Sequence, residues 1–300
     1  MNNSTSFAAA GRRAFGPIVL AYVMAAGVAV AVGYAVPGSV LMKALCGDIA
    51  ATLVIYGFSC IYRNASFYDA YWSVAPPLLA LYFFFAHGGV LDWRGVMVSA
   101  LVWAWAIRLT HNWARGWQGL HHEDWRYVDL QETTGRWWWL VNLFGIQLMP
   151  TLLVFTGCIS LHVVFSHAHA PLSFWDLCAT LIGWFALWME WRADNQLHAF
   201  KQQAEPGELL RAGVWRWCRH PNYTGELGFW LALYVYACAA SGRWDTDLAW
   251  LGPLIMIILF VFISIPMIDK RMARNRPDYA DHMARSCALL PVSHWVWREP

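Results

Sequence analysis

Charged residues are scarce in this sequence. Only 13% of its 300 residues are aspartate, glutamate, lysine or arginine, whereas 59% are hydrophobic. A soluble domain needs roughly a quarter of its residues charged, because its surface must be covered with polar groups. The scarcity of charge therefore argues against a soluble domain and predicts an integral membrane protein. The net charge of +2 gives no sign of a nucleic-acid partner, and we expect none.

Cysteine is limited to seven residues, an odd number, and no Cys-x-x-Cys pair occurs. This pattern indicates neither a disulfide scaffold nor a metal site, so we interpret the cysteines as small buried hydrophobic residues. His162, His167 and His169 follow one another closely, with Asp176 as the nearest acid. We interpret them as loop histidines on the outer face and predict no metal site.

Gly-x-Gly-x-x-Gly and Walker sequences are also missing. Any nucleotide must therefore be held by side chains of loops and helix ends instead of a soluble dinucleotide fold. We detect no internal repeat and no low-complexity linker. The sequence predicts a short cytosolic tail, residues 1–16, followed by a single transmembrane domain over residues 17–300.

Long apolar runs are what the sequence does contain. Runs of about 17 to 25 residues can cross a bilayer as helices. They lie near residues 17–36, 44–62, 68–86, 95–111, 137–160, 172–191, 225–241 and 248–267. The first follows Arg12 and Arg13 as a signal peptide would, but its length and lack of a cleavage site favour a retained helix. We predict an all-α fold, a polytopic transmembrane bundle with seven to eight spanning helices.

The basic residues predict how these helices are oriented. With the N-terminus inside and eight spans, only Lys43, Arg94 and Arg243 of the 21 basic residues fall on the outer face, and Arg108 lies inside a helix. All the others fall on the cytoplasmic side, as the positive-inside rule requires. We therefore expect both termini in the cytoplasm and, for a bacterial protein, the inner membrane as the location.

One polar stretch, residues 207–226, stands between two apolar runs. Its arginines Arg211, Arg216 and Arg219 carry planar, permanently charged groups suited to phosphate. Pro221 and Gly225 are expected to bend the backbone, so that the polar residues beside them point inward. We interpret this stretch as the cytosolic mouth of a cofactor site.

Three further polar groups border apolar runs. Asn64, Tyr68, Asp69 and Trp72 precede the third run and either cap a helix or face the bundle interior. Arg108, Asn112 and Arg115 share one helical face, and a loop with Glu123-Asp124-x-Arg126-Tyr127 follows, which alternatively is a solvated salt-bridged turn. Glu190 and Asp194 lie one turn apart at the end of the sixth run, where a snorkelling helix end is the alternative.

Two of these stretches carry a family resemblance. The segment Arg219-His220-Pro221-Asn222-Tyr223-Thr224-Gly225-Glu226, preceded by Gly207-Glu208-Leu209-Leu210-Arg211, resembles the C-terminal domain of the membrane steroid 5α-reductase family, especially its bacterial branch. A shorter form, Arg-His-Pro-x-Tyr-x-Gly, also occurs in isoprenylcysteine carboxyl methyltransferases. The Glu-Asp-x-Arg-Tyr loop resembles the reductase branch, as does the tail from Asp269 to Tyr279 that closes with Leu289-Leu290-Pro291.

The resemblance implies an NADPH-dependent reductase that transfers hydride to the β-carbon of an enone, such as a 3-oxo-Δ4 steroid. Cofactor-binding segments are expected at residues 112–136, 192–224 and 268–300. The predicted cofactor-binding residues are Arg108, Asn112, Arg115, Glu123, Asp124, Arg126, Tyr127, Glu190, Asp194, Arg211, Trp215, Arg219, His220, Asn222, Tyr223 and Lys270. Eukaryotic members polarise the substrate carbonyl with a Gln-Glu pair and a tyrosine, which this chain lacks at those places. Arg63-Asn64 stands at about the place of that pair, and Asp69, Tyr68 or Glu226 are the predicted substitutes. Together with Asn64 they form the predicted catalytic set.

Two other functions stay open. A membrane methyltransferase would use S-adenosylmethionine, which needs no arginine-lined phosphate pocket. A lipid-binding membrane protein without enzymatic activity would use neither cofactor. For the reductase we expect a monomer, surrounded by membrane lipid, that takes a lipophilic substrate from the bilayer.

Overall fold

The computed structural model describes residues 3–205 and 207–289, with side chains from residue 15 onward. Every regular element in these ranges is helical, and none of the described residues forms a strand. The all-α prediction is therefore confirmed. Residues 290–300 of the predicted cofactor-binding tail, which include Leu290-Pro291 of its closing motif, lie outside the described residues.

The chain divides into two compact units, which are treated separately below. Unit 1 comprises Met1–Leu91 and Val102–Ser166, and unit 2 comprises Asp92–Leu101 and His167–Pro300. The helices up to residue 166 are α1 (Asn3–Ala35), α2 (Val40–Tyr62), η1 (Ala65–Tyr68), α3 (Tyr71–Ala86), α4 (Trp93–Gly116), α5 (Trp125–Thr134), η2 (Gly135–Trp137), α6 (Trp138–Val141), η3 (Asn142–Leu148) and α7 (Met149–Ser166). Those that follow are α8 (Phe174–Gln203), η4 (Gly213–Arg216), α9 (Pro221–Ser241), η5 (Thr246–Leu248), α10 (Leu251–Leu259), η6 (Phe260–Ser264), α11 (Ile265–Asn275) and α12 (Tyr279–Arg285).

Each of the eight predicted apolar runs lies mainly in helices of the structure. Four segments are long and apolar enough to cross a membrane: Phe15–Ala35, Val40–Tyr62, Trp125–Ser166 and Thr246–Asn275. The third of these is interrupted by the π-helix η3, and the fourth by the π-helix η6. The coarse prediction, a membrane protein with several spanning helices, follows directly from these segments. By contrast, α3 has only 16 residues.

The described part of the predicted cytosolic tail is helical, because α1 begins at Asn3 and includes residues 3–16. Ala8, Ala9 and Ala10 are strong helix formers, and no proline occurs before Pro17, so nothing in this segment stops the helix.

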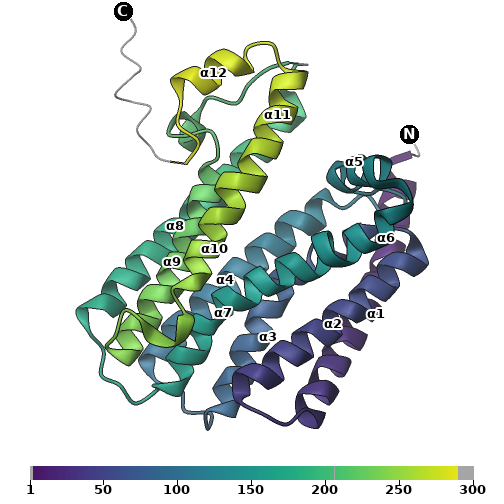
Figure 1. Cartoon of the computed structure of the whole chain (residues 1–300). Helices are drawn as coiled ribbons and strands as arrows, with labels where there is room; N and C mark the ends of the chain where they lie inside the picture. The colour runs from purple at the N-terminus through teal and green to yellow at the C-terminus, as the bar shows by residue number, and fades with distance from the viewer. Residues whose placement is uncertain (1–2, 206, 290–300) are drawn as a thin grey trace, which may run out of the picture. The chain divides into compact units, whose positions relative to one another are not determined.

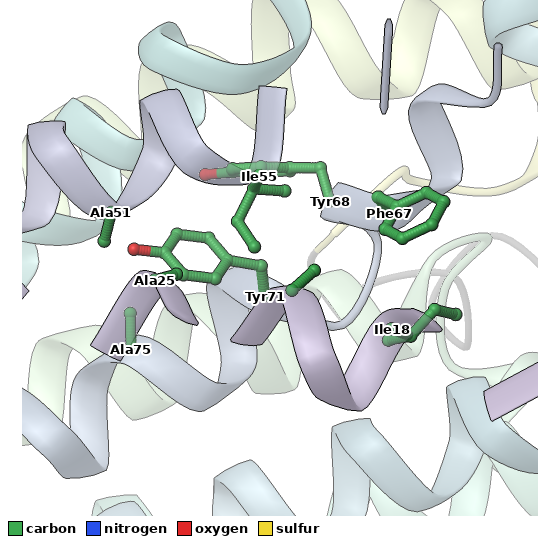
Figure 2. Close-up of a cluster of buried hydrophobic side chains, with 9 residues drawn as sticks. Ile18, Ala25, Ala51, Ile55, Phe67, Tyr68, Tyr71 and Ala75 are labelled. Atoms are coloured by element: carbon green, nitrogen blue, oxygen red, sulfur yellow. The ribbon is translucent and has the colours of Figure 1, made fainter. Parts of the chain in front are cut away.

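Small residues let the first helices of unit 1 approach closely. A Cβ atom added to Gly47 of α2 would lie 2.8 Å from the carbonyl oxygen of Ala29 in α1. Such small residues are typical of helix pairs within membranes, where close backbone packing replaces the hydrophobic effect. The neighbouring core joins α1 and α2 to η1 and α3 through Ile18, Ile55, Phe67 and Ala75. Figure 2 shows the rings of Tyr68 and Tyr71 in this core, with both hydroxyl groups pointing away from Phe67.

In unit 2, α8 and α9 run side by side, and α10 and α11 continue along them (Figure 1). Pro221 occupies the first turn of α9, where its missing N–H leaves no helical hydrogen bond unmade. Gly225 lies inside α9, so the prediction that it bends the backbone is wrong. A Cβ atom there would lie 2.4 Å from Cγ of Glu190 and 2.8 Å from the Ala186 carbonyl oxygen. Glycine at this position instead allows α9 to pack closely against α8.

Arg94 and His162, which the sequence analysis placed toward the outer face, both lie within helices. Arg94 is fully buried near the start of α4, and its Nε atom lies 2.6 Å from Oδ1 of Asp176. The same guanidinium donates to the carbonyl oxygens of Ala170 and Pro171, so it fixes the chain just before α8. His162 lies within α7, not in a loop, and its Nδ1 is 3.0 Å from Nε2 of His87.

Candidate functional site

The predicted catalytic residue Asn64 holds two loops of unit 1 together. It is only 2% exposed, and its side-chain nitrogen donates to the carbonyl oxygens of Leu120 at 2.9 Å and His122 at 3.0 Å. Its side-chain oxygen accepts the amide of Ser66 at 2.8 Å. Both hydrogens of the side-chain amide are thereby used, which gives Asn64 the geometry of a structural brace.

The Glu-Asp-x-Arg-Tyr loop contacts the same segment. Glu123 accepts the backbone amide of Ala65 at 2.6 Å, and burial raises the pKa of this carboxyl group. Asp124 caps α5 by accepting the amide of Arg126 at 2.9 Å and also pairs with the guanidinium of that residue at 2.7 Å. The Tyr127 hydroxyl donates to Oδ1 of Asp69 at 2.6 Å. These contacts bring five predicted residues together and join residues 64–69 to residues 120–127.

The other predicted residues of unit 1 lie nearby in the sequence but elsewhere in the packing. Asn112 accepts from Nε of Arg115 at 2.9 Å near the end of α4, and Arg108 is half-buried on the same helix. The Tyr68 hydroxyl lies 2.8 Å from Oγ1 of Thr151, which in turn lies 2.9 Å from Oγ1 of Thr52. Tyr68 therefore belongs to a buried row of hydroxyl groups between α2 and α7.

In unit 2, a carboxylate that the sequence analysis did not select organises the polar motif. Asp269 of α11 accepts from Nη2 of Arg219 at 3.0 Å, lies 2.9 Å from Nε2 of His220 and accepts the Tyr279 hydroxyl. The only sequence signal was an acid at the head of the basic tail. Arg219 also donates to the carbonyl oxygens of Met283 and Ser286. The first two residues of the motif thus fasten the C-terminal segment to the start of α9.

Backbone contacts extend this attachment. The amides of Arg219 and His220 donate to the carbonyl oxygens of Cys287 and Ala288, each at 3.0 Å. The Thr224 hydroxyl donates to the carbonyl oxygen of Leu289 at 2.6 Å. The motif before α9 and the described end of the chain therefore contact each other directly.

A polar pocket of about 230 Å³ lies beside this attachment, lined by Arg211, Asp278, Asp281, His282 and Arg285. His282 is 7% exposed, and its Nδ1 has no hydrogen-bond partner among the described residues. Burial, followed by the charges of Arg211 and Arg219, lowers the pKa of His282 to about 4. A buried neutral imidazole flanked by arginines is suited to an anionic ligand, which would supply the missing partner.

The remaining predicted residues of unit 2 line the contact of α8 with α9. Trp215 donates its indole N–H to the carbonyl oxygen of Ala193 at 3.1 Å, and Glu226 accepts the indole N–H of Trp230 at 3.0 Å. Glu190 is fully buried beside Gly225. The side-chain oxygen of Asn222 is buried and lacks a hydrogen-bond partner among the described residues.

Three further predicted residues have simpler surroundings. Tyr223 stacks on the ring of His220, with 5.4 Å between the ring centres, and also contacts Phe260. Asp194 is half-buried on α8, and Lys270 is exposed on α11.

Unit 1 contains a second, apolar pocket of about 590 Å³ between α1, α2 and α3. It is lined by Tyr22, Ala26, Ala29, Val30, Gly33, Tyr34, Lys43, Ala44, Gly47, Asp48, Ala51, Tyr71, Val74, Ala75, Leu78, Leu79, Leu81, Tyr82, Phe85 and Ala86. The Tyr71 hydroxyl donates to Oδ1 of Asp48 at 3.0 Å within this lining. Asn64, Tyr68 and Asp69 do not contribute to it. Sequence reasoning missed Asp48, although an acid inside an apolar run is itself a signal of function.

Comparison with known proteins gives a family. Residues 55–286 match the family described as protein of unknown function (DUF1295). The chain belongs to this family. The matched residues include Asn64, Asp269 and all residues that line the polar pocket. Lys43 and Asp48 of the apolar pocket precede the matched residues.

One curated relative and the solved structures complete the comparison. The chain is 26% identical over 273 residues to "Uncharacterized protein C594.04c" of Schizosaccharomyces pombe, which covers 81% of this chain and 78% of that protein. No solved structure matches the chain.

Proposed function

We propose that this protein is a membrane-embedded reductase that uses NADPH to reduce the C=C bond of a lipophilic enone, such as a 3-oxo-Δ4 steroid. The observation that carries the proposal is the polar pocket of unit 2, where Arg211 and Arg285 flank the buried His282. A phosphate group would accept from Arg211 and from the unpaired Nδ1 of His282, with the positive charge of Arg285 beside it. Each such charged hydrogen bond contributes on the order of 1.5 to 3 kcal/mol.

The residues of unit 2 fit other parts of NADPH as well. The unpaired side-chain oxygen of Asn222 can accept from a carboxamide N–H, and the carboxylates of Asp278 and Asp281 can accept from ribose hydroxyls. S-adenosylmethionine carries no phosphate, so this pocket supports a dinucleotide over the methyltransferase alternative.

The apolar pocket of unit 1 supplies what the substrate would need. Its size lies within the usual range of about 300 to 1,000 Å³ for small-molecule sites, and aliphatic and aromatic side chains form most of its lining. Within this lining, the Tyr71 hydroxyl, now paired with Asp48, is a donor that could turn to a substrate oxygen. A donor held in an apolar site stabilises the negative charge that develops on a carbonyl oxygen.

The proposed reaction balances with one hydride and one proton. NADPH, when bound, supplies the hydride to the β-carbon of the enone. The Tyr71 hydroxyl, which donates to Asp48 in the free protein, would turn to donate to the carbonyl oxygen as negative charge develops there. A proton taken up from water is then added to the α-carbon, which gives the saturated ketone. Asn64 and the residues that contact segment 64–69 hold η1 in place, and η1 ends three residues before Tyr71. Glu226 accepts a hydrogen bond from Trp230 within α9.

We further propose eight membrane spans, with α3, α4, α8 and α9 crossing in addition to the four apolar segments, and both termini in the cytoplasm. The distribution of basic residues supports this topology. The burial of Arg94 against Asp176 supports it too, because this arginine is neutralised within the protein. We propose that the protein is a monomer and that it lies in the bacterial inner membrane.

The direct test is purification in a mild detergent, followed by mass spectrometry of any nucleotide that remains bound. Thermal stabilisation is then compared for added NADPH and S-adenosylmethionine, and NADPH consumption is measured with a 3-oxo-Δ4 steroid. We expect stabilisation by NADPH alone. Stabilisation by S-adenosylmethionine would favour the methyltransferase, and no response to either would favour a lipid-binding protein.

A further inference from the structure

The apolar pocket of unit 1 is an elongated groove. Its lining residues run from Tyr22 to Tyr34 along α1 and from Tyr71 to Ala86 along α3. At a rise of 1.5 Å per residue, these stretches are roughly 18 and 22 Å long. Near the far end, the Tyr82 hydroxyl donates to the carbonyl oxygen of Val40 at 3.3 Å. The end of α3 therefore lies beside the start of α2.

The groove has a different polar group toward each end. Asp48 and Tyr71 form the hydrogen-bonded pair toward one end. Lys43 contributes to the lining nearer the other end, where α2 begins, and precedes Asp48 by about 7.5 Å of helix rise. Lys43 is half-buried and has no ion-pair partner among the described residues. Lys43 is the single basic residue of the lining, and Asp48 is its single acid.

An ammonium group at the edge of an apolar groove favours an anionic ligand. Lysine carries three donors and no acceptor, so apolar neighbours leave its hydrogen-bonding capacity unused. A carboxylate on a molecule that fills the groove would provide a partner through a charge-assisted hydrogen bond.

The size of the groove limits what this molecule can be. At roughly 30 Å³ per heavy-atom group, the share of one water molecule, 590 Å³ accommodates about 20 such groups. One acyl chain or one fused-ring skeleton is of this size. A phospholipid with two acyl chains is about twice as large.

We propose that the groove binds a lipophilic monocarboxylate, with its carboxylate at Lys43 and its other polar end at Asp48 and Tyr71. The inference rests on the proposed function only in treating this ligand as the substrate that is reduced. The reductase would then act on carboxylated lipids in preference to neutral ones.

Binding of radiolabelled oleic acid and methyl oleate to the detergent-purified full chain, without NADPH, tests this inference. The two probes share one acyl chain and differ in charge. At pH 8 we expect the acid to bind the wild type roughly five- to tenfold more tightly than the ester. Lys43→Gln should remove this preference and leave the affinity for the ester unchanged, and Lys43→Arg should retain it.

Ester binding shows that each variant is folded. Lys201→Gln is the matched control, because Lys201 is an exposed lysine of α8 and contributes nothing to the groove. Equal affinity of the wild type for acid and ester would overturn the proposal. So would a Lys43→Gln variant that binds both probes equally less well, or displacement of oleate by phosphatidylglycerol as effective as by unlabelled oleate.

The outcome is separate from that of the proposed function. A preference for the acid in a protein that does not bind NADPH would overturn the reductase and leave the ligand class of the groove in place. NADPH binding without this preference would do the reverse.

Discussion

Nε2 of His220 lies 2.9 Å from Oδ1 of Asp269, although the two residues are 49 positions apart in the sequence. The same carboxylate accepts a hydrogen bond from Arg219 at 3.0 Å. These contacts join the first residues of the motif before α9 to the end of the chain. Arg219 and His220 therefore have a structural role in addition to any contact with a cofactor.

Asp269→Asn should lower the melting temperature markedly, because a neutral amide cannot balance Arg219 and cannot accept from all the donors that surround it. The side chain of Asp269 is only 12% exposed, and breaking such a buried pair costs about 3 kcal/mol or more. Circular dichroism during heating in detergent measures the change. Asp245→Asn is the control, because Asp245 and its partner Arg243 are 75% and 69% exposed. An equal effect of the two substitutions would contradict the role given to Asp269.

Gly225→Ala should destabilise the protein by about 1 to 3 kcal/mol, since the added methyl group would meet Glu190 at 2.4 Å and the backbone of Ala186 at 2.8 Å. Gly57→Ala in α2 should be neutral or stabilising, because nothing lies within 4 Å of its Cβ position and alanine favours helix. The melting temperatures of the two variants give a direct comparison. A tolerated Gly225→Ala would show that α8 and α9 are not closely packed there.

Tyr71→Phe should reduce kcat for an enone by about a hundredfold or more, because it removes one donor to the carbonyl oxygen and keeps the ring. The dissociation constant of NADPH should not change. Steady-state NADPH oxidation and cofactor titration check the two parts. Tyr56→Phe is the matched control, since the Tyr56 hydroxyl donates to the carbonyl oxygen of Trp139 outside the pocket. Full activity of Tyr71→Phe would exclude the proposed carbonyl donor.

Arg211→Gln should weaken NADPH binding by roughly ten- to a hundredfold and leave the melting temperature of the free protein unchanged. Arg211 is exposed at the pocket, so losing its charge removes a phosphate contact without opening the core. Isothermal titration in detergent provides the measurement. Arg243→Gln, a change of the same kind at an exposed arginine elsewhere in unit 2, should bind NADPH normally. Unchanged affinity in Arg211→Gln would remove the pocket from the cofactor site.

His282 should make stability depend on pH in a defined window. Its pKa is about 4 in the folded protein, against 6.5 ordinarily, so between these values the unfolded chain binds a proton that the folded protein does not. The contribution is fully present above pH 6.5 and is lost as the pH falls toward 4, with a total on the order of 3 kcal/mol. His282→Gln should lack this loss in a series of melting temperatures. His198 is exposed, so His198→Gln should show the same pH dependence as the wild type. A melting temperature of His282→Gln that falls with pH as much as that of the wild type would contradict the role given to His282.

The sequence by itself determined the all-helical fold and the positions of the eight apolar helices. Hydrophobic length is a local property, so these helices can be recognised without a structure, whereas the Ser39 cap of α2 and the start of α9 at Pro221 were not predicted. The sequence also located the polar stretches, because arginine, histidine and asparagine residues concentrated between apolar runs can be read directly from the order of the residues.

Only the tertiary structure decided what those residues contact. Asp269 could not be identified as the partner of Arg219 and His220, and Asp48 could not be paired with Tyr71, because helix packing brings together positions far apart in the chain. The role of Gly225 also changed from a bend to a contact, since its neighbour Glu190 belongs to another helix. Composition and periodicity specify which segments are buried as helices. The faces that meet are set by side-chain shape and by the need to pair buried polar groups, and both depend on the folded neighbours.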